Sequence, residues 1–182
     1  MQLPPDWSAF LDVLKRHGVR FLLVGAHALA AHGRPRATQD LDVLVAPTTA
    51  NARKVSAALA EFGFTKLAAD WKWFTKPYRV TMLGRIPFRI DVLTSISGVS
   101  FTTAWRNRIT MATDIGELAV LGLADLRANK RAAGRPKDLL DLALLDELAL
   151  AEPSRRRSTH TEARQKSGPK RKGRSVPKRR SP

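Results

Sequence analysis

The chain is predicted to form a mixed α/β (α+β) fold, one mixed β-sheet flanked by helices, with a disordered basic tail. Short apolar runs of strand length alternate with longer stretches whose apolar residues recur at helical spacing. Glycine or proline stands at most junctions between these segments, as expected for turns. Beyond Glu152 large apolar side chains are almost absent, so that part cannot bury enough surface to become ordered.

The first half of the chain is predicted to contain three helices and two strands. The helices follow from apolar residues three and four apart, and the strands from short, continuous apolar runs. Gly18, Gly33 and Gly63 mark the three helix ends. In chain order we expect a helix at 6–16, a strand at 21–24, a small-residue helix at 26–32, a strand at 40–45 and a helix at 47–62.

The second half is predicted to add strands and then two closing helices. Residues 64–93 are rich in aromatic and β-branched side chains, which favours strands. Phe101 and Trp105 fall in a short connecting stretch, and Pro136 suits the first position of a helix. We expect strands at 71–74, 78–82, 86–93, 108–111 and 118–121, then helices at 123–133 and 136–149.

Charge divides the chain into two parts. Of a net charge of +16, residues 151–182 hold +10, from twelve Lys or Arg and two Glu, and the remainder holds +6. We therefore predict a folded domain at 1–151 and a disordered basic tail at 152–182. Such a tail binds RNA through its phosphates without sequence preference. The alternative is a solubilising tail without a specific partner.

Other classes of protein are excluded by composition. The chain has no cysteine, which excludes disulfides, thiolate chemistry and a zinc–thiolate site. No apolar run approaches the roughly 18 residues of a membrane span, and the N-terminus lacks the order of a signal peptide. We expect a cytoplasmic protein without a membrane partner.

Carboxylates stand on two of the predicted strands. Asp40 and Asp42 are two residues apart, so their side chains leave the same face of one strand, and Asp91 lies within a later strand. Neighbouring carboxylates repel each other unless a cation lies between them. If Asp91 joins the pair, the three would form an oxygen-rich site suited to Mg²⁺, which indicates phosphoryl or nucleotidyl transfer. The alternative is a turn with solvated acids.

These residues resemble the motif of the polymerase-β-like nucleotidyltransferase superfamily: in this chain thirteen residues separate Gly25-Ala26 from Asp40-Leu41-Asp42, and a later strand contains Asp91. The resemblance covers about residues 20–145 and implies a palm-like nucleotidyltransferase fold. More narrowly, the chain is similar to small prokaryotic nucleotidyltransferases that include toxins of abortive-infection toxin–antitoxin systems. The segments that carry this narrower likeness are 23–28, 36–42 and 130–138.

The resemblance implies a function and a set of catalytic residues. A nucleoside monophosphate would pass from an NTP to a hydroxyl, with RNA, such as a tRNA 3′ end, as acceptor and an antitoxin protein as partner. Asp40, Asp42 and Asp91 would be catalytic and hold Mg²⁺, as two ions. Gly25 and Ala26 would bind the triphosphate. Ala26 stands where the superfamily has Gly or Ser, which keeps the backbone N–H but supplies no hydroxyl.

Two cations are predicted to bind the nucleotide. At about 100° per residue Lys130 points between Leu123 and Leu126, toward the body of the domain, where its ammonium can meet triphosphate oxygens. The alternative is a lysine that extends past the leucines into solvent. Arg36 can pair with phosphate through two hydrogen bonds, or simply be exposed.

Several alternatives remain open at this point. Transfer to a protein or to a small-molecule (antibiotic) hydroxyl is a second enzymatic interpretation, and a non-catalytic RNA-binding module is a third. Residues 135–138 belong either to the site or to a cap of the last helix. Trp71, Trp73 and Tyr78 either stack on a base or form the core of a hairpin.

Overall fold

The computed structural model describes residues 1–147, and the predicted basic tail at 152–182 lies outside the described residues. The chain divides into two units, 1–145 and 146–182. The fold and the site belong to the first unit. None of the helices formed by residues 1–147 combines the length and the apolar character needed to span a membrane.

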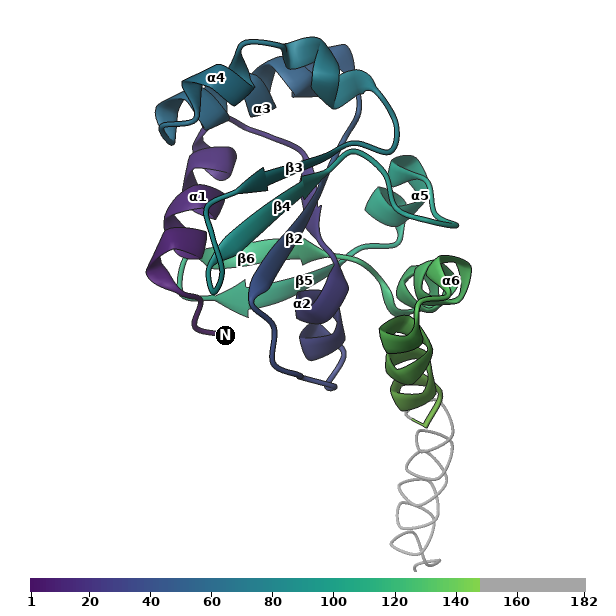
Figure 1. Ribbon diagram of the computed structural model, residues 1–182. Coiled ribbons are helices and arrows are strands. Elements are labelled where there is room, and N and C mark those ends of the chain that lie inside the picture. The colour runs from purple at the N-terminus through teal and green to yellow at the C-terminus, as the bar shows by residue number, and fades with distance from the viewer. Residues whose placement is uncertain (148–182) are drawn as a thin grey trace, which may run out of the picture. The chain divides into compact units, whose positions relative to one another are not determined.

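One six-stranded mixed sheet forms the centre of the first unit (Figure 1). The strand order is β3-β4-β2-β1-β6-β5, in which β2–β4 and β1–β6 are parallel pairs and the other neighbours are antiparallel. This confirms the predicted mixed sheet. The strands are β1 Phe21–Leu23, β2 Asp40–Val45, β3 Val80–Leu83, β4 Arg89–Leu93, β5 Ile109–Thr113 and β6 Gly116–Val120.

Helices flank the sheet, as predicted. In Figure 1, α1 and α3 lie on one side of the sheet and α2 and α6 on the other. The sequence-based bounds of α6 are reproduced, and Gly134 follows it in the left-handed conformation. The helices are α1 Pro5–Arg16, α2 Gly25–Ala31, α3 Thr49–Glu61, α4 Thr65–Ala68, the 3₁₀ helix η1 Trp71–Thr75, α5 Phe101–Arg106, α6 Leu123–Ala133 and a final helical stretch from residue 136.

The two faces of the central strands differ in polarity. Leu41 and Val43 on β2 are fully buried, and so is Val92 at the paired position of β4. Because strand side chains alternate, the opposite face of the same strands carries Asp40 and Asp42. The apolar face thus anchors the sheet, while the polar face is left available for a site.

The predicted strand at 71–74 is wrong, because these residues form η1. The Asp70 side chain accepts a hydrogen bond from the Lys72 N–H and starts a helical turn. Phe74 is fully buried, and Trp73 Nε1 donates to Thr81 Oγ1 over 3.1 Å. The aromatic side chains therefore project from a 3₁₀ helical turn in different directions, rather than alternately from the two faces of a strand.

The connecting stretch with Phe101 and Trp105 is also more regular than predicted. It forms α5, whose N-cap Ser100 accepts a hydrogen bond from the Thr103 N–H at 3.1 Å. The two aromatic rings stack with centroids 5.8 Å apart. A helix of six residues is too short to give a clear periodic signal, which explains why the sequence pattern missed it.

Candidate active site

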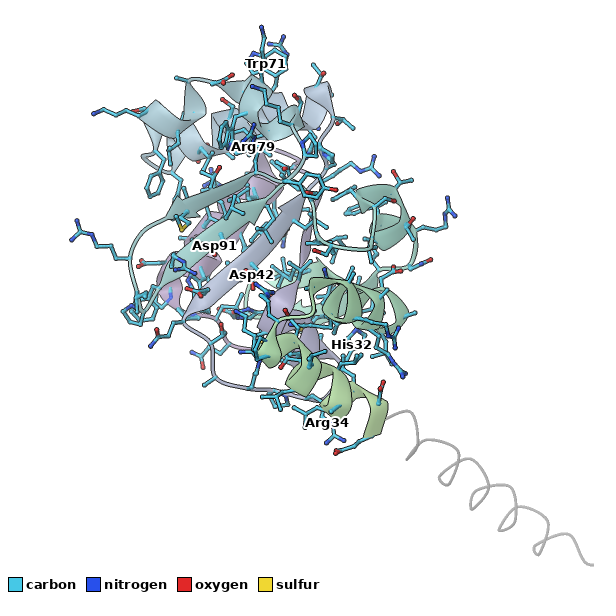
Figure 2. All side chains as sticks on the ribbon, turned by 45° about the vertical axis from the view of Figure 1, so that its right-hand side comes forward. His32, Arg34, Asp42, Trp71, Arg79 and Asp91 are labelled. Carbon is cyan, nitrogen blue, oxygen red and sulfur yellow. The ribbon has the colours of Figure 1, made fainter. Side chains whose placement is uncertain are left out.

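The three predicted carboxylates lie on one face of two adjacent parallel strands. Asp42 on β2 is in register with Asp91 on β4, and Asp40 is two residues before Asp42 on the same face. Figure 2 shows Asp42 and Asp91 close together on neighbouring strands. The structure thus brings Asp40, Asp42 and Asp91 together, although 48 residues separate the last two in the chain.

Gly25 makes room for the carboxylate of Asp42. A Cβ atom at residue 25 would lie 2.0 Å from Asp42 Oδ2, and the backbone there has φ of +60°, which favours glycine. In addition, the Val24 N–H donates to the Asp42 carbonyl oxygen at 3.1 Å. The need for glycine at the start of α2 is therefore explained by the space that the Asp42 carboxylate occupies there. The sequence pattern did not indicate this interaction.

Arg89 lies between two of the carboxylates. Its Nε and Nη2 atoms donate to Asp91 Oδ1 and Oδ2 over 2.9 and 3.1 Å, and Nη2 also lies 2.8 Å from Asp40 Oδ2. Hydrogen bonding to Asp91 is the main reason why the pKa of Arg89 is raised. The guanidinium thereby supplies the positive charge that neighbouring carboxylates require.

The electrostatics of the face still favour another cation. Burial, and then the charges of Asp91 and Asp40, raise the pKa of Asp42, an effect that Lys137 and Lys130 reduce. Asp40 Oδ1 is buried and has no donor among the described residues. The face thus carries three carboxylates against one guanidinium, and one of its oxygens is unsatisfied.

The donor set fits a hard divalent ion such as Mg²⁺, which prefers carboxylate oxygens. Among residues 1–147 no group of three acidic, histidine or cysteine side chains is gathered closely enough to enclose a metal. Arg89 occupies three carboxylate oxygens of this face, both of Asp91 and Oδ2 of Asp40. A metal that used these three oxygens would have to displace Arg89.

We therefore predict that Arg89→Gln raises the affinity for Mn²⁺, measured by calorimetry without nucleotide, by about tenfold, because it removes a competing charge within a few ångströms. The melting temperature of the metal-free protein should fall, since no guanidinium then offsets the repulsion between the carboxylates of Asp40 and Asp91. Arg85→Gln in the β3–β4 turn, with the same charge change, is the control. An unchanged or lower Mn²⁺ affinity in Arg89→Gln would show that Arg89 does not compete for the metal position.

Lys130 is the centre of a second cluster of charges. It is only 3% exposed, which confirms its predicted inward direction. Its Nζ atom donates to Asp138 Oδ1 at 2.9 Å and to Asp141 Oδ2 at 2.7 Å. Both carboxylates are buried. The ammonium therefore links α6 to the following helical stretch.

Two arginines complete this second cluster. Arg36 makes a bidentate pair with Asp141, through Nε at 2.9 Å and Nη2 at 3.2 Å. Arg135 makes a bidentate pair with Asp138 and remains largely exposed. Its hydrogen bonds with Asp138 raise the pKa of Arg135 and, together with those from Lys130, lower the pKa of Asp138 against the effect of burial. Three cations thus surround two carboxylates, and the cluster keeps a net positive charge.

Two cavities adjoin the carboxylate face. The first, which we call the charged cavity, has a volume of about 520 Å³. The second, the tyrosine cavity, has a volume of about 440 Å³. Both are lined by Gly25, Asp42, Asp91, Lys130 and Arg135. The remaining predicted site residues, Ala26, Arg36 and Asp40, line the charged cavity together with Arg89 and Lys137.

Sequence reasoning missed Arg89 and Asp141. Arg89 could have been found, because it precedes Asp91 by two residues and so shares its face of the strand. Asp141 follows Asp138 by three residues, a spacing that places both on one side of a helix. Its contacts with Lys130 and Arg36 depend on the packing of separate segments, which no local pattern reveals.

The sequence matches no protein-family model and no curated protein. Solved structures that resemble it include a Thermotoga maritima protein described as a nucleotidyltransferase, at a TM-score of 0.43 and 14% identity over 83% of this chain and 89% of that one. Another is an antigenic nucleotidyltransferase-like protein of Paracoccidioides brasiliensis. Its TM-score is 0.47, and its sequence is 11% identical over 79% of this chain and 75% of that one. Such values are too low to transfer a chemistry, so the function must follow from this chain's own residues.

Proposed function

We propose that the chain is a Mg²⁺-dependent nucleotidyltransferase that moves a nucleoside monophosphate from an NTP to a hydroxyl. The observation that supports this most strongly is the pairing of Asp42 with Asp91 on parallel strands, with Asp40 on the same face. Opposite charges lie around one cavity, since Lys130, Arg135 and Lys137 line it as well. A triphosphate bound to a divalent cation presents both charges that such a cavity complements.

Asp40, Asp42 and Asp91 would hold the metal, as two ions in our proposal. When bound, Mg²⁺ shields the negative charge of the triphosphate and polarises its phosphorus–oxygen bonds. The buried Asp40 Oδ1, which has no donor among the described residues, supports this assignment. The pKa of Asp42, raised by burial and then by the charges of Asp91 and Asp40, supports it as well, because a bound cation would offset both effects.

The cations of the charged cavity would bind the phosphates. Arg135 and Lys137 are exposed and line the cavity, so they can approach phosphate oxygens directly. Lys130 and Arg36 are already paired with carboxylates, and in our proposal they add a fixed positive field and switch part of their hydrogen bonding to the triphosphate. Gly25 and Ala26 would bring backbone N–H groups to the same cavity.

The transfer itself requires one proton acceptor. As the acceptor oxygen bonds to the α-phosphorus, the bond to the β-phosphate oxygen breaks and pyrophosphate leaves. Asp91 lines both cavities and is in register with Asp42. We assign to its carboxylate the proton of the attacking hydroxyl.

We further propose that the acceptor is RNA, such as a tRNA 3′ end, and that the protein acts in the cytoplasm as a toxin controlled by an antitoxin protein. The net charge of +16, of which residues 151–182 hold +10, supports a polyanionic acceptor. The resemblance of 23–28, 36–42 and 130–138 to toxin nucleotidyltransferases supports the role. Incubation with labelled NTP, Mg²⁺ and RNA tests both the transfer activity and the choice of RNA as acceptor. We expect the label to enter RNA.

Deleting residues 153–182 should weaken RNA binding while leaving the melting temperature and the NTP affinity unchanged. The deleted segment contains none of the proposed site residues. Its cations would release counterions from RNA, so the truncated protein should also show a shallower dependence of RNA affinity on salt concentration. RNA affinities of both forms at several salt concentrations provide the measurement. An identical salt slope would show that the tail does not contact RNA, and would favour a protein or small-molecule acceptor.

A further inference from the structure

The tyrosine cavity differs in chemistry from the charged cavity that it adjoins. Beyond the shared site residues, the charged cavity is lined by further charged side chains such as Arg36, Arg89 and Lys137. The tyrosine cavity is instead lined by Val80, Leu93, Ile96 and Tyr78, with hydroxyl and amide groups beside them. An apolar wall next to a triphosphate site is suited to the uncharged part of a nucleotide.

Tyr78 is unusual in both exposure and backbone. Its relative exposure of 82% is large for an aromatic residue within a folded unit. Its φ of +56° makes it the single non-glycine residue of the described chain in the left-handed region. Bulky side chains rarely adopt this conformation, and residues that do are concentrated at functional sites. The chain thus presents an aromatic ring to solvent at an energetic cost to the fold.

The backbone around Tyr78 is held in place by neighbouring hydrogen bonds. The Tyr78 N–H donates to Ser95 Oγ at 2.7 Å, and the Arg79 N–H donates to Thr94 Oγ1 at 3.0 Å. Thr94 is buried, and its hydroxyl in turn donates to the Lys76 carbonyl oxygen at 2.7 Å. These contacts fix the backbone on both sides of Tyr78, so the point from which the ring projects is set before any ligand binds.

We propose that the tyrosine cavity binds the nucleobase of the NTP, with the base stacked on the ring of Tyr78. The inference rests on the proposed function, because the triphosphate must occupy the adjoining charged cavity. Stacking on an exposed aromatic ring tolerates any base, since every base has a π face. Hydrogen-bonding groups at the cavity wall, Asn129, Ser95 and Ser97, can then contact the edge of the base.

The geometry favours a base over an acceptor chain at this position. The two cavities meet at Asp42, Asp91 and Lys130, so a ligand with its phosphates beside these residues extends its nucleoside directly into the tyrosine cavity. The volume of about 440 Å³ is within the range of small-molecule sites, which lies between roughly 300 and 1,000 Å³.

Binding of α,β-methylene NTP analogues, with each of the four bases, tests this proposal against binding of tripolyphosphate, which has no base. In the presence of Mg²⁺, Tyr78→Ala should raise the Kd of the NTP analogues by about tenfold, the effect expected from losing one stacked base. Its Kd for tripolyphosphate should equal that of the wild type. Tyr78→Phe should restore NTP binding, because the ring is retained. Leu67→Ala, an exposed apolar residue of α4 outside this cavity, should leave both affinities unchanged.

Tyr78→Gly separates ligand binding from folding. Glycine adopts a positive φ without strain, so this variant should keep or raise the melting temperature while losing NTP affinity as Tyr78→Ala does. Suppose that both proteins bind tripolyphosphate, and that Tyr78→Ala binds each of the four NTP analogues with the same Kd as the wild type. The base-stacking proposal is then wrong and the proposed function stands. If the wild type binds neither tripolyphosphate nor any NTP analogue, both are wrong.

Discussion

Replacing Asp42 with asparagine is expected to reduce nucleotidyl transfer by about 10³-fold, because the loss of one central carboxylate removes both a metal ligand and the charge that orients the transition state. The melting temperature without metal should hold or rise. Asp42 is half-buried, and burial, followed by the charges of Asp91 and Asp40, raises its pKa, so its charge opposes folding in the metal-free protein.

The pH dependence gives this prediction a second readout. A carboxyl whose folded-state pKa is raised favours folding when it is protonated, and this contribution is lost as pH rises through that pKa. The gain in melting temperature of Asp42→Asn over the wild type should therefore be larger at pH 7 than at pH 4, measured in EDTA. Asp6→Asn, on the exposed first turn of α1, is the control. Near-normal transfer by Asp42→Asn would contradict the metal assignment.

Replacing Lys130 with methionine is expected to lower the free energy of unfolding by about 3 kcal/mol, since breaking a buried ion pair leaves uncompensated charge. Lys130 bridges two buried carboxylates, Asp138 and Asp141, and each keeps only one arginine after the change. The variant should also need more NTP for half-maximal binding while it retains Mn²⁺ binding, because its proposed partner is phosphate rather than metal.

Two variants separate a specific effect of Lys130 from a general loss of charge. Arg131→Met, on the exposed side of the same helix, should change the free energy of unfolding by no more than about 0.5 kcal/mol. Adding Asp141→Asn to Lys130→Met should recover part of the loss, since one buried charge is removed with its partner. Urea unfolding of the four proteins provides the comparison. Equal stability of Lys130→Met and the wild type would contradict the bridging role.

Much of the fold could be predicted from local patterns of apolar residues, glycine and proline. The helix at 123–133 follows from Leu123 and Leu126, three residues apart, and from the closing Gly134, and the strand at 40–45 from the apolar run 43–45 that follows Asp40 and Asp42. Residues 71–74 show the limit of such patterns. Their aromatic content indicated a strand, but the Asp70 cap and the burial of Phe74 favour a helical turn.

The candidate site could be predicted only in part, because local sequence patterns do not show how distant segments pack. Asp40 and Asp42 share a face in any strand, so their pairing follows from sequence spacing. The register of Asp42 with Asp91, and the place of Arg89 between Asp40 and Asp91, depend on how two distant strands align. Asp141 likewise acquires its role only when Arg36 and Lys130 are brought to it.

The most direct test of the central claim is transfer of label from an NTP labelled at its α-phosphate. The wild-type protein is incubated with each of the four labelled NTPs and Mg²⁺, together with total cellular RNA, total protein or a panel of small hydroxyl compounds. We predict that label enters RNA with the wild type, and that EDTA or Asp42→Asn abolishes this transfer. Absence of label from every acceptor, or equal labelling by Asp42→Asn, would contradict the assignment of Asp40, Asp42 and Asp91 as the site of nucleotidyl transfer.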